Sequence, residues 1–159
     1  MLPETSSARL NPSDVLERLT QRLPKVVSPQ AHALFDLAAF PAMLGLAYWL
    51  WPRNRPAAKL LLANALLEGP NATVTNFPPA VVPLLSFRTH VSTGLVGLPI
   101  YTAVSLLTKN IPLKYRLLPL AFGVVPLIVN ALSNTRAGGE GMVEHSVAEA
   151  LSNADSARI

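Results

Sequence analysis

The 159-residue chain contains no cysteine, and only 14% of its residues are charged. Without cysteine the chain can form no disulfide, no CxxC redox pair and no thiolate metal site. About a quarter of the residues in a soluble globular domain are charged, so the low fraction of charged residues argues against that class. Aromatic residues are also few, and no basic run with interleaved aromatics resembles a nucleic-acid surface. We therefore expect no thiol chemistry and no nucleic-acid partner.

Long apolar stretches take the place of the missing charges. Positions 89–108 and 117–135 contain no Asp, Glu, Lys or Arg, and Asp36 is the only such residue in 26–52. Each stretch is close to the ~20 residues that a helix needs to cross ~30 Å of hydrocarbon. A further apolar stretch starts near Pro56, and its helix either extends past Gly69 or crosses only part of the bilayer. The sequence predicts an all-α integral membrane protein with four transmembrane helices, at about 29–51, 56–69, 88–108 and 113–133.

The apolar region contains an internal repeat. The segment from His32 to Pro41 returns as the segment from His90 to Pro99, with leucine five residues after each histidine. Further along, Asn64-Ala-Leu-Leu-Glu is followed by a second copy, Asn130-Ala-Leu-Ser-Asn. Each half of the region therefore predicts one helical hairpin, and two duplicated hairpins predict a four-helix bundle. Gly94 and Gly97 offer a small surface for close helix contact.

Two tails flank the predicted transmembrane domain of residues 28–135. In the N-terminal tail, residues 1–27, leucines at helical spacing predict a short amphipathic helix, either on the membrane surface or as a solvated linker. Residues 136–159 are expected to form a soluble C-terminal tail. The two short hairpin loops hold slightly more lysine and arginine than the opposite helix ends, which favours loops in the cytoplasm. We expect a multi-pass protein of the bacterial inner membrane.

Polar side chains gather at one end of the predicted bundle, because an even number of spans puts the starts of helices 1 and 3 beside the ends of helices 2 and 4. His32 and Asp36 share a helix face, since they are four residues apart. An ionisable residue about one turn inside an apolar helix marks function or a pairing partner, and Arg88 is the expected partner of Asp36. The predicted ligand or ion-pair cluster consists of His32, Asp36, Asn64, Glu68, Arg88, His90 and Asn130.

Four interpretations of this cluster stay open. It is either a pocket that binds a headgroup, small ligand or proton, or a buried network that fixes helix register. Two histidines on equivalent helices also permit a haem with His32 and His90 as axial ligands. Metal binding by His32, Asp36, Glu68 and His90 is allowed by ligand type, but no local motif points to it. We therefore predict no cofactor and no metal.

The chain resembles small bacterial four-helix membrane proteins of the SPW-repeat-like type, whose function is largely uncharacterised. The resemblance lies in the two histidine segments, in Arg88-Thr89-His90 and in Asn64-Ala-Leu-Leu. The resemblance covers about residues 28–135 and implies a fold, not an activity. The chain departs from that pattern in lacking the Ser-Pro-Trp tripeptide and in having Gly94 where the second repeat would have aspartate.

No catalytic motif is present, since the chain has no GxSxG, HExxH or glycine-rich phosphate loop. The leading hypothesis is a non-enzymatic membrane protein, either an accessory or structural subunit or a bundle that binds a small ligand or lipid. The alternatives are a transporter or proton-conducting protein that uses the cluster around Asp36, and a haem-bearing electron carrier. The lipid bilayer is the expected partner, with a homo-oligomer or a larger membrane complex as candidate assemblies.

Overall fold

The computed structural model describes residues 20, 22–76 and 84–135, and every extended regular element in these ranges is a helix. The all-α prediction is confirmed for this part of the chain. The predicted amphipathic helix and C-terminal tail lie mostly or wholly in 1–19 and 136–159, outside the described residues. The helices are α2 (Pro29–Leu50), α3 (Arg55–Thr73), α4 (Phe87–Leu107) and α5 (Leu113–Leu132).

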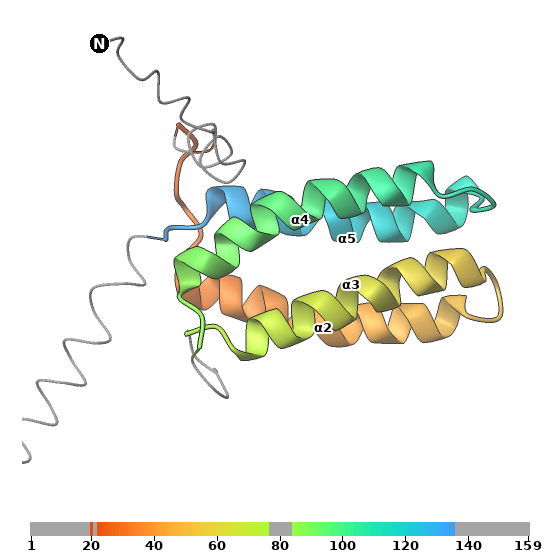
Figure 1. Ribbon diagram of the computed structural model, residues 1–159, viewed down its shortest axis with the longest axis horizontal. Coiled ribbons are helices and arrows are strands. Elements are labelled where there is room, and N and C mark those ends of the chain that lie inside the picture. Colours follow the sequence, from red (N-terminus) through yellow and green to blue (C-terminus); the bar gives the residue numbers. More distant parts are fainter. Residues whose placement is uncertain (1–19, 21, 77–83, 136–159) are drawn as a thin grey trace, which may run out of the picture.

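The helices form two antiparallel hairpins that lie side by side (Figure 1). α2 packs along α3, α4 packs along α5, and α3 and α5 make the main contacts between the hairpins. The two short loops lie at one end of the molecule. The starts of α2 and α4 and the ends of α3 and α5 lie at the other (Figure 1). We call this second end the histidine end, because His32 and His90 lie there.

The first turns of α2 and α4 are capped in the same way. Ser28 Oγ accepts a hydrogen bond from the Ala31 N–H at 3.2 Å, and Ser86 Oγ accepts one from the Thr89 N–H at 3.1 Å. Such caps satisfy a backbone donor that has no partner inside the helix. Because a histidine follows each capping serine by four residues, the caps place both imidazoles one turn inside the histidine end.

Two short backbone bridges join the hairpins at the histidine end. Val27, before α2, pairs with Ser133, after α5, and Thr75, after α3, pairs with Leu85, before α4. The Val27 N–H donates to Leu132 O at 3.0 Å, and the Asn76 N–H donates to Leu85 O at 2.7 Å. Each bridge thus ties the end of one hairpin to the beginning of the other.

Every helix contains a proline in its interior, a pattern that membrane helices tolerate when neighbouring groups satisfy the freed carbonyls. α3 continues through Pro70 and ends at Thr73. Of the two ends that the sequence left open for this helix, the structure therefore has the longer one.

Three of the four helices, α2, α4 and α5, are long and apolar enough to cross a membrane. α3 is not among them, because Lys59, Asn64 and Glu68 lower its hydropathy. The outer surface of the hairpins is nonetheless apolar, with large exposed side chains on every helix that include Leu34, Leu37, Leu66, Leu67, Ile100, Leu107, Val125 and Ile128. These features are compatible with a multi-pass membrane protein.

Small residues allow the helices of each hairpin to approach closely. Buried alanines, among them Ala47, Ala57 and Ala58, line the α2–α3 contact around Leu61. Gly94 lies directly against Asn130 of α5, where an added Cβ would be 2.7 Å from Asn130 Oδ1. Gly97 has no atom within 4 Å of such a Cβ. Of the two glycines expected to make a close helix contact, Gly94 therefore does so and Gly97 does not.

Candidate functional site

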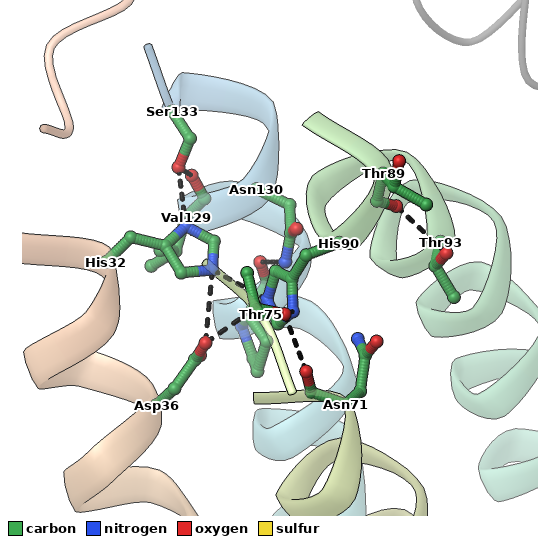
Figure 2. A network of polar contacts seen from close by, with 11 residues as sticks. His32, Asp36, Asn71, Thr75, Thr89, His90, Thr93, Val129, Asn130 and Ser133 are labelled. Carbon is green, nitrogen blue, oxygen red and sulfur yellow. Dashed lines mark hydrogen bonds and ion pairs between the residues drawn. The ribbon is translucent and has the colours of Figure 1, made fainter. Parts of the chain in front are cut away.

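Three of the predicted residues meet inside the histidine end of the molecule (Figure 2). His32 and Asp36 lie one turn apart on α2, and His90 reaches them from α4. The Nε2 atoms of the two histidines are 3.2 Å apart. Asp36 Oδ2 lies 3.4 Å from His32 Nε2 and 3.2 Å from His90 Nε2. The histidine side chains are 0% and 2% exposed and that of Asp36 is 14% exposed, so the centre is nearly closed to the surroundings.

A hydroxyl group holds the far side of each imidazole ring. His32 Nδ1 is 2.7 Å from Ser133 Oγ, and His90 Nδ1 is 3.0 Å from Thr75 Oγ1. Both hydroxyls donate to a carbonyl four residues earlier: Ser133 to Val129 O at 2.7 Å, and Thr75 to Asn71 O at 2.6 Å. Because each hydroxyl hydrogen is already used, each oxygen accepts from the Nδ1–H of its histidine.

This assignment of the hydrogens fixes what the rings present to each other. A neutral imidazole that carries its hydrogen on Nδ1 has a lone pair on Nε2. When both rings are neutral in this tautomer, both Nε2 lone pairs point into the small space that Asp36 Oδ2 also faces, whereas a proton on one Nε2 would be donated to the other Nε2, 3.2 Å away. Asp36 Oδ2 lies at ion-pair distance from both rings but meets the directional criteria of a hydrogen bond with neither. The centre is a convergence of three electron-pair donors, which attracts a positively charged species.

The ring of Phe87 packs against the imidazole rings of both histidines. Its centroid lies 5.1 Å from that of His32 in an edge-to-face contact, and 6.4 Å from that of His90 in a nearly parallel one. Phe87 itself is buried, with Ala33, Val91 and Leu95, in the apolar cluster beneath the centre. The apolar cluster and the two hydroxyls leave each imidazole little freedom to rotate.

The other predicted cluster residues lie around the centre and not in it. Asp36, Asn64, Glu68 and Asn130 border a hollow of about 10 Å³ between the hairpins. In this hollow Asn64 Nδ2 donates to Phe122 O at 3.1 Å and Asn130 Nδ2 donates to Pro126 O at 2.9 Å. Asn130 Oδ1 is buried and accepts no hydrogen bond among the described residues. A second hollow, of about 70 Å³, lies on the other side of Asp36, between α2 and α3.

Arg88 was expected to pair with Asp36, but the ion-pair partners found for Asp36 are the two histidines. Arg88 lies exposed in the first turn of α4, two residues before the buried His90. Residues two apart in a helix point to nearly opposite faces, since each residue turns about 100°. The sequence placed Arg88 at the right height, and the helix turns it to the exposed side.

Sequence reasoning missed the two hydroxyl residues and Phe87. A signal for the hydroxyls was present, because His32 and His90 are 58 residues apart and the same offset relates Ser28 to Ser86 and Thr75 to Ser133. A comparison of residue types does not reveal this second pair, because threonine and serine are different residues that offer the same hydroxyl group. Asn64 and Asn130, which the sequence paired, are not related by this offset, and they lie in the middle of α3 and the last turn of α5.

The geometry also bears on which groups the centre could hold. Among the described residues, the metal-ligating side chains whose ligand atoms all lie within 4.8 Å of one another are His32, Asp36 and His90, and Glu68 lies outside this group. A haem between the histidines would need its two axial nitrogens on opposite sides of the iron, about 4 Å apart for bonds of about 2.0 Å. The observed 3.2 Å separation gives a haem no support.

The fold and the centre together define an all-helical chain, compatible with a multi-pass membrane protein, that carries a buried His–Asp–His cluster at one end. No protein-family model, no curated protein and no solved structure matches the chain. Function is therefore argued from the geometry alone.

Proposed function

We propose that the protein is a four-span membrane protein whose duplicated hairpins hold one buried binding centre for a small cation, and that it is not an enzyme. The observation that carries this proposal is the convergence of the Nε2 atoms of His32 and His90 with Asp36 Oδ2, each pair within 3.4 Å. A cation accepts electron density from all three atoms at once. Without one, the lone pairs and the carboxylate repel one another in a medium of low dielectric constant.

The contacts of α3 support its crossing of the membrane. It packs along α2 over its length and touches both helices of the other hairpin. Lys59 lies near its loop end, where a long basic side chain can reach the headgroup region, and Asn64 and Glu68 face the interior hollow. Leu66 and Leu67 lie on the exposed side. Polar residues turned inward and leucines turned outward suit a helix that is shielded by its neighbours.

Single-cysteine labelling tests the number of spans, and the absence of native cysteine makes it direct. We expect Arg53→Cys and Lys109→Cys, one in each hairpin loop, to react with a membrane-impermeant maleimide from the same side of sealed vesicles. Leu84→Cys should react only from the opposite side. If α3 does not cross, Arg53→Cys and Lys109→Cys will label from opposite sides, and the four-span proposal is wrong.

The 58-residue offset supports the duplication. It relates the capping serines, the histidines, the hydroxyl residues and the interior prolines Pro41 and Pro99. Asp36 is the exception, because its counterpart is Gly94. Two equivalent halves thus contribute one histidine each, while the single carboxylate comes from the first half alone. This arrangement favours one binding centre shared by both hairpins over two separate sites.

Thermal unfolding in detergent tests the binding centre. We expect at least one small cation, in a panel of Na⁺, K⁺, ammonium, Mg²⁺, Ca²⁺, Co²⁺ and Zn²⁺, to stabilise the wild-type protein saturably, by about 2.7 kcal/mol at a hundredfold excess over Kd. Asp36→Asn should remove the stabilisation, and Asp14→Asn, which changes an aspartate far from the centre in sequence, should retain it. If no cation stabilises the wild-type protein, the cluster is a structural network and the chain a structural subunit.

One observation favours transport as a second candidate function. Asp36 borders both the hollow between α2 and α3 and the small hollow beside Asn64, Glu68 and Asn130, as Phe40 also does. A cation could pass from one to the other along these polar groups. Flux of the stabilising cation into vesicles that contain the protein, absent with Asp36→Asn, would distinguish transport from binding alone.

We place the protein, by the same proposal, in the bacterial inner membrane with its hairpin loops in the cytoplasm, as the resemblance to SPW-repeat-like proteins implies. Arg53, Lys109 and Lys114 at the loop end support this orientation under the positive-inside rule. The exposed leucines and valines suit lipid, and they equally suit a second copy of the chain or a larger membrane complex.

A further inference from the structure

We propose that the cation is a divalent transition-metal ion of the zinc type, bound tetrahedrally by His32 Nε2, His90 Nε2 and Asp36 Oδ2 with an open fourth position. This inference rests on the proposed binding function and names its ligand. It is carried by the spacing of the three ligand atoms, by the hydrogen bonds behind the two imidazoles and by the space beside Asp36.

The spacing of the ligand atoms fits a tetrahedral ion. Bonds of about 2.0–2.1 Å, as zinc makes to histidine and carboxylate, place tetrahedral ligand atoms about 3.3–3.4 Å apart. The three separations among His32 Nε2, His90 Nε2 and Asp36 Oδ2 are 3.2, 3.4 and 3.2 Å. An octahedral ion with bonds of the same length would bring adjacent ligands to about 2.8–3.0 Å. The triangle of donors is therefore nearly that of a tetrahedral face.

The ligand types exclude the common hard cations. Two imidazoles and one carboxylate suit zinc, copper, iron and nickel, whereas magnesium and calcium take oxygen ligands almost exclusively. Two histidines with one carboxylate also serve iron in open octahedral sites. The observed separations are longer than the octahedral spacing and favour the tetrahedral choice.

The hydrogen bonds behind the imidazoles are those of metal-binding histidines. Such histidines donate the N–H of the other ring nitrogen to an oxygen, which fixes the tautomer and makes the ligand nitrogen more basic. Here His32 donates to Ser133 and His90 donates to Thr75, and both hydroxyls are buried and anchored to helix carbonyls. A network that served only to join helices would alternate donors and acceptors. In this one the two Nε2 atoms, 3.2 Å apart, need a proton or a metal ion between them once both Nδ1 atoms carry hydrogen.

The surroundings provide room and charge for the ion. The hollow of about 70 Å³ borders Asp36 and has the volume of several water positions, although neither histidine lines it. Asp36 supplies one negative charge as a ligand. Glu68, on the wall of the smaller hollow that Asp36 also borders, offers a second carboxylate nearby. Two carboxylates beside one site match a divalent ion better than a monovalent one.

Co²⁺ serves as a spectroscopic probe of the site. The full chain is purified in detergent with a tag that contains no histidine, stripped with a chelator and titrated with Co²⁺ alone. We expect one Co²⁺ per chain, the intense visible absorption of tetrahedral Co²⁺, and loss of that absorption when one equivalent of Zn²⁺ is added.

Matched variants separate metal binding from folding. His90→Gln removes a ligand and should abolish the absorption, whereas His145→Gln, at the third histidine of the chain, should leave it unchanged. Thr75→Val keeps all three ligands and removes the hydroxyl behind His90. It should weaken the affinity about 10–100-fold, the usual effect of losing such a partner. Thr75→Ser restores the hydroxyl and should restore the affinity, so the test holds even if His90→Gln fails to fold.

Several results would overturn the metal assignment. These are the lack of a one-to-one complex, the pale spectrum of octahedral Co²⁺, or equal effects of His90→Gln and His145→Gln. If a different cation stabilises the protein while Co²⁺ and Zn²⁺ do not bind, the metal assignment is wrong and the cation-binding function stands. If no cation of the panel stabilises it and Co²⁺ does not bind, both are wrong.

Discussion

Replacing Arg116 by methionine is expected to lower the free energy of unfolding by about 2–4 kcal/mol. The guanidinium group of Arg116 donates to four backbone carbonyls at the turn between α4 and α5, those of Ser105, Leu106, Thr108 and Ile111. The last carbonyls of a helix have no partner inside it. Each hydrogen bond to a charged group contributes about 1.5–3 kcal/mol, and water at this end of the molecule replaces part of that.

Two further variants make the Arg116 measurement specific. Arg116→Lys keeps the positive charge but loses the planar fork that reaches several carbonyls at once, so it should recover less than half of the lost stability. Lys114→Met removes a neighbouring exposed charge together with its contact to the Tyr115 ring, whose centroid lies 4.9 Å from Lys114 Nζ, and should change stability by less than about 1 kcal/mol. Unfolding in mixed detergent micelles gives all three values. Equal losses for Arg116→Met and Lys114→Met would show that charge at this turn matters and the carbonyl contacts do not.

Gly94→Leu is expected to destabilise the protein by about 3 kcal/mol, because α4 and α5 touch at this point. A Cβ atom on Gly94 would lie 2.7 Å from Asn130 Oδ1 and 2.9 Å from Asn130 Cγ. The amide of Asn130 cannot turn away freely, since its nitrogen donates to Pro126 O at 2.9 Å. Overpacking of a close contact typically costs about 1–3 kcal/mol, and a leucine adds three more carbons beyond the Cβ.

Gly97→Leu is the control for Gly94→Leu, one turn along the same helix. Nothing lies within 4 Å of a Cβ at Gly97, and leucine favours the helix more than glycine does, by roughly 0.5–1 kcal/mol. The control should therefore be neutral or stabilising in the same unfolding assay. A Gly94→Leu protein as stable as Gly97→Leu would mean that α4 and α5 are not held together at Gly94.

The positions of the helices were predictable because they follow from length and local chemistry. Charge-free stretches marked α4 and α5, and Ser28 and Ser86 sit where capping residues belong. The extension of α3 beyond Gly69 was not decided by the sequence, because the residues that follow this helix are held by backbone hydrogen bonds to Leu84 and Leu85. Those partners come from tertiary structure, which periodicity does not reveal.

The sequence pointed to three members of the centre, but not to its geometry and not to Thr75, Ser133 and Phe87 around it. His32, Asp36 and His90 could be assigned to one end of the molecule, because the helices of each predicted hairpin run antiparallel. The position of a residue along a helix does not fix the direction in which its side chain points around the helix axis. In α4 that direction buries His90 and leaves Arg88 exposed. The spacing of 3.2–3.4 Å among the three ligand atoms depends on how two hairpins dock, which no local pattern in the sequence encodes.

The two backbone bridges at the histidine end carry a topological consequence. The chain enters α2 beside the point where it leaves α5, just as it passes from α3 to α4 beside the other bridge. The four helices therefore form a closed cycle of contacts. The start of α2 and the end of α5 meet at the bridge between Val27 and Ser133, and α3 and α4 meet at the bridge between Thr75 and Leu85. A circular permutation that connected position 135 to position 22 through a short linker and opened the chain between Asn76 and Leu84 would retain the residues of both bridges and of all four helices.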